Sequence, residues 1–316
     1  MGTCWTTTEC SSKGGKVEGN CAAGFGVCCI FSYSACGSTI SQNISYITNP
    51  NYPTAYTVSS TGSCSYSINP LNSDICQLRL DFDSFSLASS TTDGSCVDTM
   101  AITTGSGQFY PNLCGINTGH HIYLDTGRTT TSQTLAFTVA AAGSATYKIK
   151  VSQIECYASY AAPPGCLQYY TGSTGRVKSF NRANGKMLHN LIYNACVRRE
   201  SGSCGITWSV TDTTEYAPLA TYKLGDGAIA VHSTAAIAKT AYISIPQSFG
   251  ALYSGGTFSD QLTDESPGTV TSNGVNYELG VFSTNAAQTM TDGFDLTYNQ
   301  GACISSTNIV STQSVA

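Results

Sequence analysis

Charged residues are scarce in this chain. Asp, Glu, Lys and Arg make up 10% of its 316 residues, against about 25% in an ordinary soluble domain, and the net charge is only −5. This composition excludes a basic nucleic-acid-binding footprint and an acidic disordered tail. Serine, threonine, glycine, asparagine and tyrosine must supply the surface instead.

Long apolar runs are also missing. No uninterrupted stretch approaches the roughly 18 residues of a membrane span. Even "GAIAVHSTAAIAKTAYISI" contains His232 and Lys239, and no apolar leader follows Met1. We therefore expect a mature chain without a membrane span.

The marks of a serine hydrolase are absent too. The four histidines are His120, His121, His189 and His232, and no "GDSGG"-like or "GxSxG" nucleophile turn occurs. We therefore predict that the chain is not an enzyme and needs no cofactor.

Cysteine, in contrast, is abundant. Fifteen cysteines are far more than a reducing cytosol normally leaves as unpaired thiols, and they occur in pairs and triplets rather than in metal-type clusters. This pattern is typical of a secreted, disulfide-bonded extracellular protein.

Alternation of apolar and polar residues recurs along the chain. It is clear in "CQLRLDF" (76–82), "TYKIKV" (146–151) and "FDLTY" (294–298), and it predicts half-buried strands. One segment, "GKMLHNLIYNA" (185–195), suits either a helix or a strand edge. The chain is predicted to be all-β, and its short strands favour sandwiches.

The cysteines also reveal a repeat. In each half of the chain, two cysteines at a similar separation are followed by a third that opens an alternating strand, and a last one closes the unit. The first unit contains Cys36, Cys64, Cys76 and Cys156, and the second contains Cys166, Cys196, Cys204 and Cys303. Two tandem copies of one domain explain this spacing.

Several motifs in these units resemble the CUB family of secreted jelly-roll sandwiches. "TNPNYPTAY" (48–56) is similar to the family's "SPNYPxxY", "TTGSGQFYPNLCG" (103–115) contains its "CG" signature, and "TDGFDLTY" (291–298) matches its closing "GFxxxY". The second unit lacks an equivalent of Cys96 and Cys114. The prolines of the first motif predict an extended edge segment, across which its tyrosines pack.

The resemblance implies two tandem CUB-like jelly-roll β-sandwiches preceded by a small disulfide-rich segment. The expected parts are a cysteine-rich N-terminal segment (1–35), a CUB domain (36–157) and a CUB-like domain (158–316). The first part resembles a clip-type knot, and disulfides must order it because its cysteines are too dense for a hydrophobic core. The arrangement as a whole resembles secreted arthropod CUB proteins.

The family pattern and the repeat together imply a disulfide map. The expected pairs are Cys36 with Cys64, Cys96 with Cys114, Cys166 with Cys196, Cys76 with Cys156 and Cys204 with Cys303. An odd set remains in the N-terminal segment, namely Cys4, Cys10, Cys21, Cys28 and Cys29. One thiol of this set should be free or joined to another chain.

Calcium is the metal to consider, because many CUB domains bind it through several acidic residues. Asp98, and Asp226 in the second unit, match one of these positions, but neither unit supplies the other carboxylates that roughly six to eight oxygen ligands require. No metal site is therefore predicted. His120 and His121 should point to opposite faces of one strand, so one is expected to be packed and the other solvated.

Two further features concern the surface. Asn43 in "NIS" is the only glycosylation sequon of the chain. Nineteen tyrosines on a weakly charged surface suit a binding face, because each offers an apolar ring with a polar tip. Tyrosine is also ordinary sheet filler, so no single one is assigned.

These features predict a secreted, non-enzymatic interaction or structural protein of extracellular fluid or matrix. Its expected partners are extracellular proteins, including copies of itself that meet at open sheet edges, and glycans are a further option. Two other functions stay open: a glycan-binding, lectin-like module, and a non-catalytic regulatory partner of an extracellular serine protease cascade. No nucleic-acid partner is expected.

Overall fold

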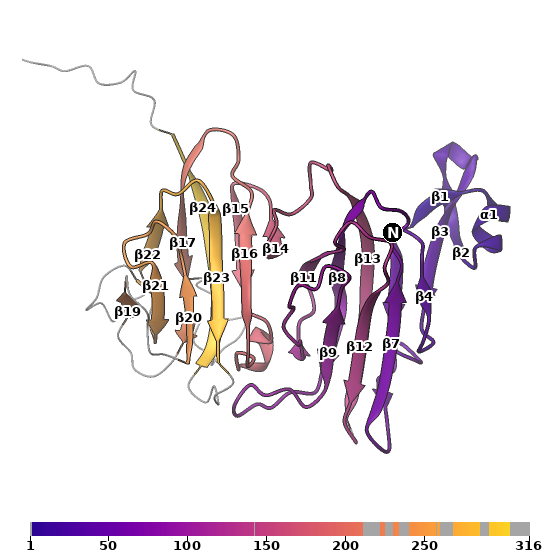
Figure 1. The fold of residues 1–316 in the computed structure, drawn as a ribbon, viewed down its shortest axis with the longest axis horizontal. Coiled ribbons are helices and arrows are strands. Elements are labelled where there is room, and N and C mark those ends of the chain that lie inside the picture. The colour runs from indigo at the N-terminus through magenta and orange to yellow at the C-terminus, as the bar shows by residue number, and fades with distance from the viewer. Residues whose placement is uncertain are drawn as a thin grey trace, which may run out of the picture.

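The computed structural model describes residues 2–141, 143–210, 222–224, 230–233, 240–256, 258–259, 268–284 and 291–303. Strands dominate, and they form two sandwich-like bodies beside a small N-terminal segment (Figure 1). Among these residues, no helix is long and apolar enough to cross a membrane. The prediction of an all-β fold is confirmed.

The N-terminal segment contains three strands and one short helix. Thr6 Oγ1 accepts a hydrogen bond from the Glu9 amide, and the Glu9 carboxylate accepts one from the Thr6 amide, which is a capping box. Strand β3 lies between β1 and β2 and then pairs in parallel with β5 of the first domain. The elements are β1 (Thr3–Trp5), α1 (Thr7–Ser12), β2 (Lys16–Cys21), the 3-10 helix η1 (Ala22–Gly24) and β3 (Gly26–Tyr33).

Two sheets form the first domain. One has the order β3–β5–β13–β8, with β10 and β11 both pairing with the far side of β8, and the other has the order β4–β7–β12–β9. The two sheets bury a core that includes Leu80, Tyr66 and Phe137. The strands are β4 (Thr39–Ile40), β5 (Ser45–Thr48), β6 (Tyr56–Thr57), β7 (Gly62–Ile68), β8 (Ile75–Leu87), β9 (Thr99–Thr103), β10 (Gly115–Ile116), β11 (His121–Asp125), β12 (Gln133–Val139) and β13 (Ser144–Glu155).

The alternation predicted for residues 76–82 continues along β8 with one interruption. Leu80 and Phe82 are buried two residues apart, but the next buried residue is Phe85. The register against β13 shifts at this point because Asp83 is an extra residue on β8. This β-bulge keeps both halves of the long strand facing the same core.

The second domain has a continuous strand path in the order β14–β16–β23–β20–β21–β18–β24–β17–β22. Trp208 is fully buried in its core, edge-on to Tyr298. The elements are β14 (Cys166–Tyr170), β15 (Thr174–Lys178), the 3-10 helix η2 (Arg182–Asn184), β16 (Ile192–Val197), β17 (Ser203–Val210), β18 (Tyr222–Leu224), β19 (Ala230–Ser233), β20 (Ala241–Ser244), β21 (Leu252–Gly255), β22 (Thr269–Ser272), β23 (Tyr277–Ser283) and β24 (Thr291–Ala302).

Of the two options for residues 185–195, the strand edge is correct. Residues 185–191 form turns and coil, and β16 begins at Ile192. The Met187 amide donates to the carbonyl of Thr291, and the Leu188 carbonyl accepts from the Ser283 hydroxyl. Backbone groups of residues 187 and 188 therefore form hydrogen bonds with β24 and β23 instead of the bonds that they would form within a helix.

The prediction of an extended segment in "TNPNYPTAY" is wrong. The chain turns after β5, and the buried Asn49 orders the turn. Its Nδ2 donates to two carbonyls of the turn, and its Oδ1 accepts from the Tyr147 amide. Tyr52 is exposed, and only Tyr56 packs partly against the core. An asparagine side chain thus supplies the bonds that the two prolines cannot make.

Candidate functional site

Seven disulfides join fourteen of the fifteen cysteines. In the two domains the pairs are those that the sequence predicts: Cys36–Cys64, Cys76–Cys156, Cys96–Cys114, Cys166–Cys196 and Cys204–Cys303. The N-terminal segment contains Cys4–Cys21 and Cys10–Cys29. Each domain therefore has one long-range disulfide, Cys76–Cys156 in the first and Cys204–Cys303 in the second. It links the third cysteine of the repeat to the last one.

Cys28 is the cysteine left without a disulfide. It alternates on β3 with Cys29, which is fully buried in the small core of the N-terminal segment. The residue opposite Cys28 on β1 is Cys4, whose sulfur is bonded to Cys21. The odd thiol is partly exposed, so it is accessible to a second thiol.

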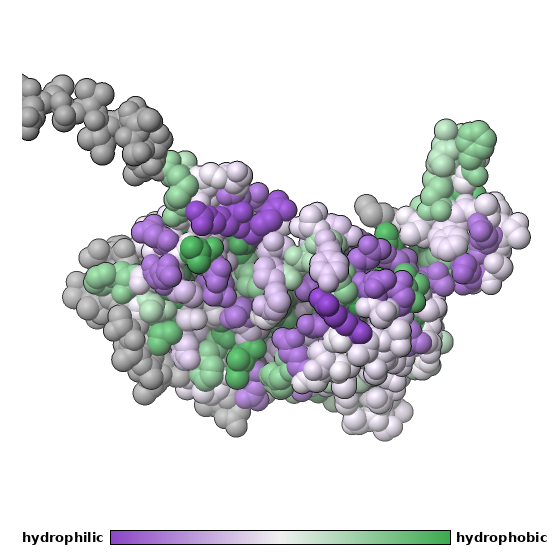
Figure 2. All heavy atoms as spheres, turned by 45° about the horizontal axis from the view of Figure 1, so that its top comes forward, coloured by the Kyte–Doolittle hydropathy of each residue, from purple (hydrophilic) through white to green (hydrophobic). Residues whose placement is uncertain are grey.

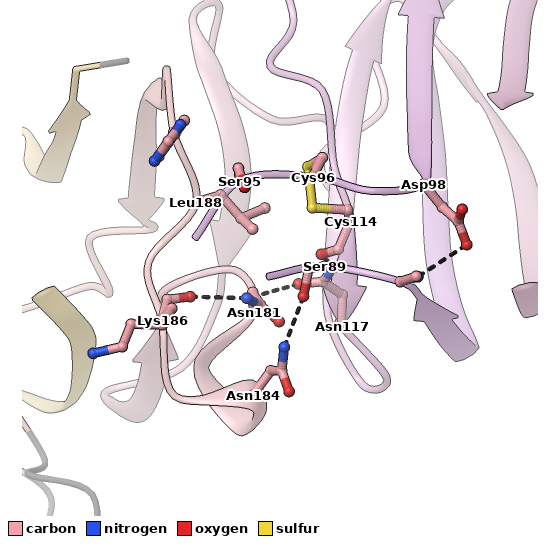
Figure 3. Close-up of a disulfide and its surroundings, with 12 residues drawn as sticks. Ser89, Ser95, Cys96, Asp98, Cys114, Asn117, Asn181, Asn184, Lys186 and Leu188 are labelled. Carbon is pink, nitrogen blue, oxygen red and sulfur yellow. Dashed lines mark hydrogen bonds between the residues drawn. A yellow bond between two sulfur atoms is a disulfide. The ribbon is translucent and has the colours of Figure 1, made fainter. Parts of the chain in front are cut away.

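Asp98 is fully buried immediately before β9. Its Oδ1 accepts from the Ala140 amide at 2.8 Å and its Oδ2 from the Ala88 amide at 3.1 Å. Figure 3 shows Asp98 on the segment that follows Cys96, with its carboxylate directed away from the Cys96–Cys114 disulfide. Both oxygens are therefore engaged in holding loops of the first domain together.

The other candidate for calcium, Asp226, lies outside the described residues. Within the described ranges, no group of three or more His, Cys, Asp or Glu side chains is placed to hold a metal ion.

Of the adjacent histidines, His121 is buried, as expected of the packed ring, and His120 is partly exposed rather than fully solvated, because both contact the second domain. His121 Nε2 lies 3.1 Å from the Tyr169 amide nitrogen and 2.9 Å from the Tyr169 carbonyl oxygen. His120 Nδ1 lies 3.1 Å from Gln168 Nε2, and its ring packs against Phe180. These contacts join the edge strand β11 to the edge strand β14 through side chains.

Burial sets the charge of these two rings. It lowers the pKa of His120 to about 3, and the neighbouring His121 and Lys178 act in the same direction. It lowers the pKa of His121 to about 4, with Arg79 as a further cause. Both imidazoles are therefore neutral at physiological pH, and each can accept a hydrogen bond from the second domain.

The connector between the domains is fixed by Gln77 of β8. Its Nε2 donates to the Ala162 carbonyl at 2.8 Å, and its Oε1 accepts from the Ala162 amide at 2.9 Å. The amide side chain thus pairs with the backbone of Ala162 as a neighbouring strand would. Pro163, Pro164 and Gly165 follow, and β14 begins at the next residue.

A second group of contacts joins loops of the two domains (Figure 3). Asn117 Oδ1 accepts from the Asn181 amide at 2.7 Å, and Asn181 Oδ1 accepts from the Ile116 amide at 3.1 Å. Asn184 Nδ2 donates to Ser89 Oγ at 2.7 Å. Asn117 and Asn181 are fully buried, so these bonds replace contacts with water that burial removes.

Sequence reasoning missed these junction residues. One signal was available, since "NRANG" (181–185) contains turn-forming residues. Asn181 has a φ of 60°, a conformation that asparagine tolerates better than most residues. The partners Asn117 and Ile116 lie far away in the sequence, in the other domain, so spacing alone could not connect them.

Asn43, the predicted glycosylation site, lies in the loop before β5 and is partly exposed. Its Oδ1 accepts from the amides of Ile44 and Gln153, each at 2.8 Å. The residue borders a groove of about 580 Å³ that also contains Arg79 and Asp81. Attachment of a glycan there stays a prediction.

The described surface is weakly charged, as the composition suggests. Figure 2 shows one face that consists largely of pale, weakly polar residues, with strongly hydrophilic residues in a few groups. Most of the described tyrosines are buried, including Tyr66, Tyr147 and Tyr253. Tyrosine therefore serves mainly as core filler here, and only a minority of the rings is available for binding.

Comparison with known proteins gives matches over both sandwich bodies. A family model described as "CUB domain" matches residues 36–150, and one described as "Animal CUB domain" matches residues 163–301. A search of curated proteins returned no match.

Three solved structures illustrate the similarity. The CUB1-EGF-CUB2 domains of rat MASP-1 are 14% identical, and the alignment covers 83% of this chain and 99% of that one with a TM-score of 0.30. The CUB1-EGF-CUB2 domain of human MASP-1/3 is 13% identical, with 82% and 100% covered and a TM-score of 0.29. The full extracellular region of zebrafish Gpr126/Adgrg6 is 14% identical, with 87% and 34% covered and a TM-score of 0.29.

Proposed function

Because the chain contains two CUB domains in tandem, we propose that it is a secreted, non-enzymatic protein that acts by binding other extracellular proteins. CUB domains commonly mediate contacts between proteins, and a chain with seven disulfides suits an oxidising extracellular space. The observation that carries the proposal is the bonded junction between the domains.

The junction matters because it fixes the spacing of two binding surfaces. The His121–Tyr169, Gln77–Ala162 and Asn117–Asn181 contacts each join a side chain of the first domain to backbone of the second domain or of the connector. A partner that touches both domains then loses little additional conformational freedom on binding. Two weak contacts at a fixed spacing combine into one stronger association.

A binding experiment tests this proposal. The oxidised full-length chain is immobilised, extracellular fluid of its source is passed over it, and retained proteins are identified and then purified. We expect at least one extracellular protein to bind in isolation. The double variant Asn117→Ala/Asn181→Ala should raise its Kd about tenfold, since a loosened junction must be ordered on binding.

The control is Asn72→Ala, which removes an exposed loop asparagine that bonds only to the nearby Asp74 amide. Its Kd should equal that of the wild type. The absence of any partner that binds in isolation, or a hydrolytic activity that purifies with the chain, would refute the proposal. Capture of a serine protease would identify the regulatory-partner function specifically.

Self-association is the second part of the proposal, and Cys28 supports it. In the larger sheet of the first domain, both edges are covered, because β3 pairs with β5 and β14 lies against β11. The strands β4 and β9 end the other sheet of this domain. The partly exposed thiol of Cys28 remains, on the segment farthest from the second domain (Figure 1). A disulfide between two Cys28 residues would join two chains without disturbing either domain.

Non-reducing electrophoresis and light scattering test the linkage. The native protein should contain a covalent dimer that reduction dissolves, and Cys28→Ser should be monomeric with unchanged thermal stability. A wild-type monomer in which iodoacetamide alkylates Cys28 stoichiometrically would exclude this mode of assembly.

A further inference from the structure

Two hollows on the second domain and the junction share one side chain. The first has a volume of about 320 Å³ and lies on the outer face of β16, β23 and β20. The second has a volume of about 470 Å³ and lies between residues of both domains. Ile192, which is 60% exposed, lines both. We call the two together the junction groove.

The first hollow is built from two rows of side chains that cross three neighbouring strands. Strand pairing aligns Ile192 with Phe282 and Tyr242 in one row, and Asn194 with Gly280 and Ser244 in the other. The rings of Tyr242 and Phe282 are stacked, with centroids 4.7 Å apart. An apolar row therefore lies directly beside a polar row.

Gly280 creates the depth of this hollow. Its position is at the centre of the polar row, between Asn194 and Ser244. A Cβ at residue 280 would collide with Ser244 Oγ and would lie 3.3 Å from Asn194 Oδ1. The missing side chain leaves room for a ligand ring beside the aromatic row.

The second hollow repeats the combination of an aromatic ring with amides. Phe109 is 67% exposed there, and Asn112 and Asn190 lie beside it. In the described part of the chain, the side chains of Asn112, Asn190, Asn194 and Ser244 make no intramolecular hydrogen bond. Their donors and acceptors are therefore available to a ligand.

The chemistry of the groove defines its ligand. Neither hollow is lined by Lys, Arg, Asp or Glu, so a charged ligand would find no counter-charge. Strands β16, β23 and β20 each pair on both sides, so no backbone edge is open to an added peptide strand. The groove therefore offers aromatic faces, side-chain amides and a hydroxyl group. These groups match a ligand ring that has an apolar C–H face and several hydroxyl groups.

We propose that the junction groove binds a neutral oligosaccharide. One sugar ring packs against Tyr242 and Phe282 above Gly280, and its hydroxyls bond to Asn194 and Ser244. The chain continues past Ile192 towards Phe109, Asn112 and Asn190. Glycan binding at this site is independent of the protein binding proposed above. It requires only the second domain and the first-domain residues that line the second hollow.

The test uses the oxidised full-length chain and four neutral probes: mannotetraose, maltotetraose, cellotetraose and N-acetylchitotetraose. A heparin tetrasaccharide is the anionic comparison. Saturation-transfer NMR detects binding, and titration calorimetry gives the Kd. We expect at least one neutral probe to bind. Tyr242→Ala and Gly280→Ala should each weaken it about tenfold, which corresponds to about 1.4 kcal/mol.

Matched controls keep the result interpretable. Phe25→Ala removes a ring that is 91% exposed on the N-terminal segment. Gly301→Ala adds a Cβ that would lie 4.0 Å from the Gly205 carbonyl oxygen, its nearest neighbour among the described residues. Both should bind as the wild type does. The proposal fails if no neutral probe binds at millimolar concentration, if only heparin binds, or if binding survives both groove variants in folded protein.

Discussion

Buried polar side chains in this protein bond mainly to backbone groups of distant segments. Asp98 holds two loops of the first domain, Asn49 orders the turn after β5, and Asn181 accepts from Ile116 across the junction. Charged residues are only 10% of the chain, so neutral amides make connections that ion pairs make elsewhere. The contacts of the two asparagines carry no net charge, so we expect them to be insensitive to screening by salt.

Asp98 gives the first prediction. Asp98→Ala should lower the free energy of unfolding by about 2 to 4 kcal/mol, because two backbone amides lose their acceptor inside the domain. Urea denaturation measures the loss. The control Asp83→Ala removes an exposed carboxylate that lies 3.5 Å from Lys148, and it should cost less than about 1 kcal/mol. Equal effects of the two substitutions would show that Asp98 has no special structural role.

The junction histidines give a prediction on pH. Their pKa values, about 3 for His120 and about 4 for His121, lie below the value of about 6.5 in an unfolded chain. The unfolded state therefore binds more protons below about pH 6.5. The stability that the neutral rings contribute is complete above that pH and is lost as the pH falls towards 4.

Denaturation at pH 7.5, 6 and 5 measures this effect. Each histidine should contribute a slope of up to about 1.4 kcal/mol per pH unit below pH 6. The variant His120→Asn/His121→Asn should lose most of that slope, whatever its stability at pH 7.5. Identical slopes for the wild type and the variant would mean that neither ring is kept neutral by the junction.

At the residue scale, the alternation of apolar and polar residues correctly predicted which side chains face the core. It did not predict which polar side chains on the opposite face are buried. Leu80, Ile149 and Phe294 are buried as the period of two requires. Asp295, a polar residue of the predicted strand "FDLTY", is also fully buried, and it pairs with Arg176 on β15 with Nε–Oδ1 at 2.6 Å. Arg176 is opposite Thr297, two residues from Asp295, so its side chain lies on the same outer face and covers the carboxylate.

At the scale of elements, local signals were read incompletely. The capping box of α1 is visible in the spacing of Thr6 and Glu9, but a helix of 6 residues is too short to show a helical period of apolar residues. The coverage of the sheet edges could not be read locally, since β3 and β14 reach the first domain from segments outside it. The sequence of an edge strand does not show whether a strand from another part of the chain will cover it.

The connector supplies a prediction at this scale. Gln77→Ala removes both bonds to Ala162, so residues 157–165 should open more often. Chymotrypsin should then cleave after Tyr157 or Tyr160, which are 89% and 58% exposed, about tenfold faster than in the wild type. Gln108→Ala, which removes only a contact with the Tyr110 hydroxyl, should leave the rate unchanged. A Gln77 variant cleaved no faster than this control would show that the connector is held by other contacts.

At the scale of the whole molecule, cysteine spacing and short motifs predicted two sandwiches of one family. They succeeded because a disulfide framework and turn-forming residues are local or repeated features. The junction could not be predicted, because it depends on where the loop at Asn117 and the turn at Asn181 meet after both domains have folded. The junction groove was hidden for the same reason, since its two rows arise from the pairing of strands distant in sequence.

The central claim is that the two CUB domains form one rigid binding unit, and residual dipolar couplings test it most directly. Backbone amide couplings are measured on the oxidised full-length chain, for strands β5, β8 and β13 of the first domain and β16, β17 and β23 of the second. If the junction holds, a single alignment tensor fits the couplings of both domains in the arrangement described above. Two tensors of clearly different magnitude would show that the domains move independently, and the account would be contradicted.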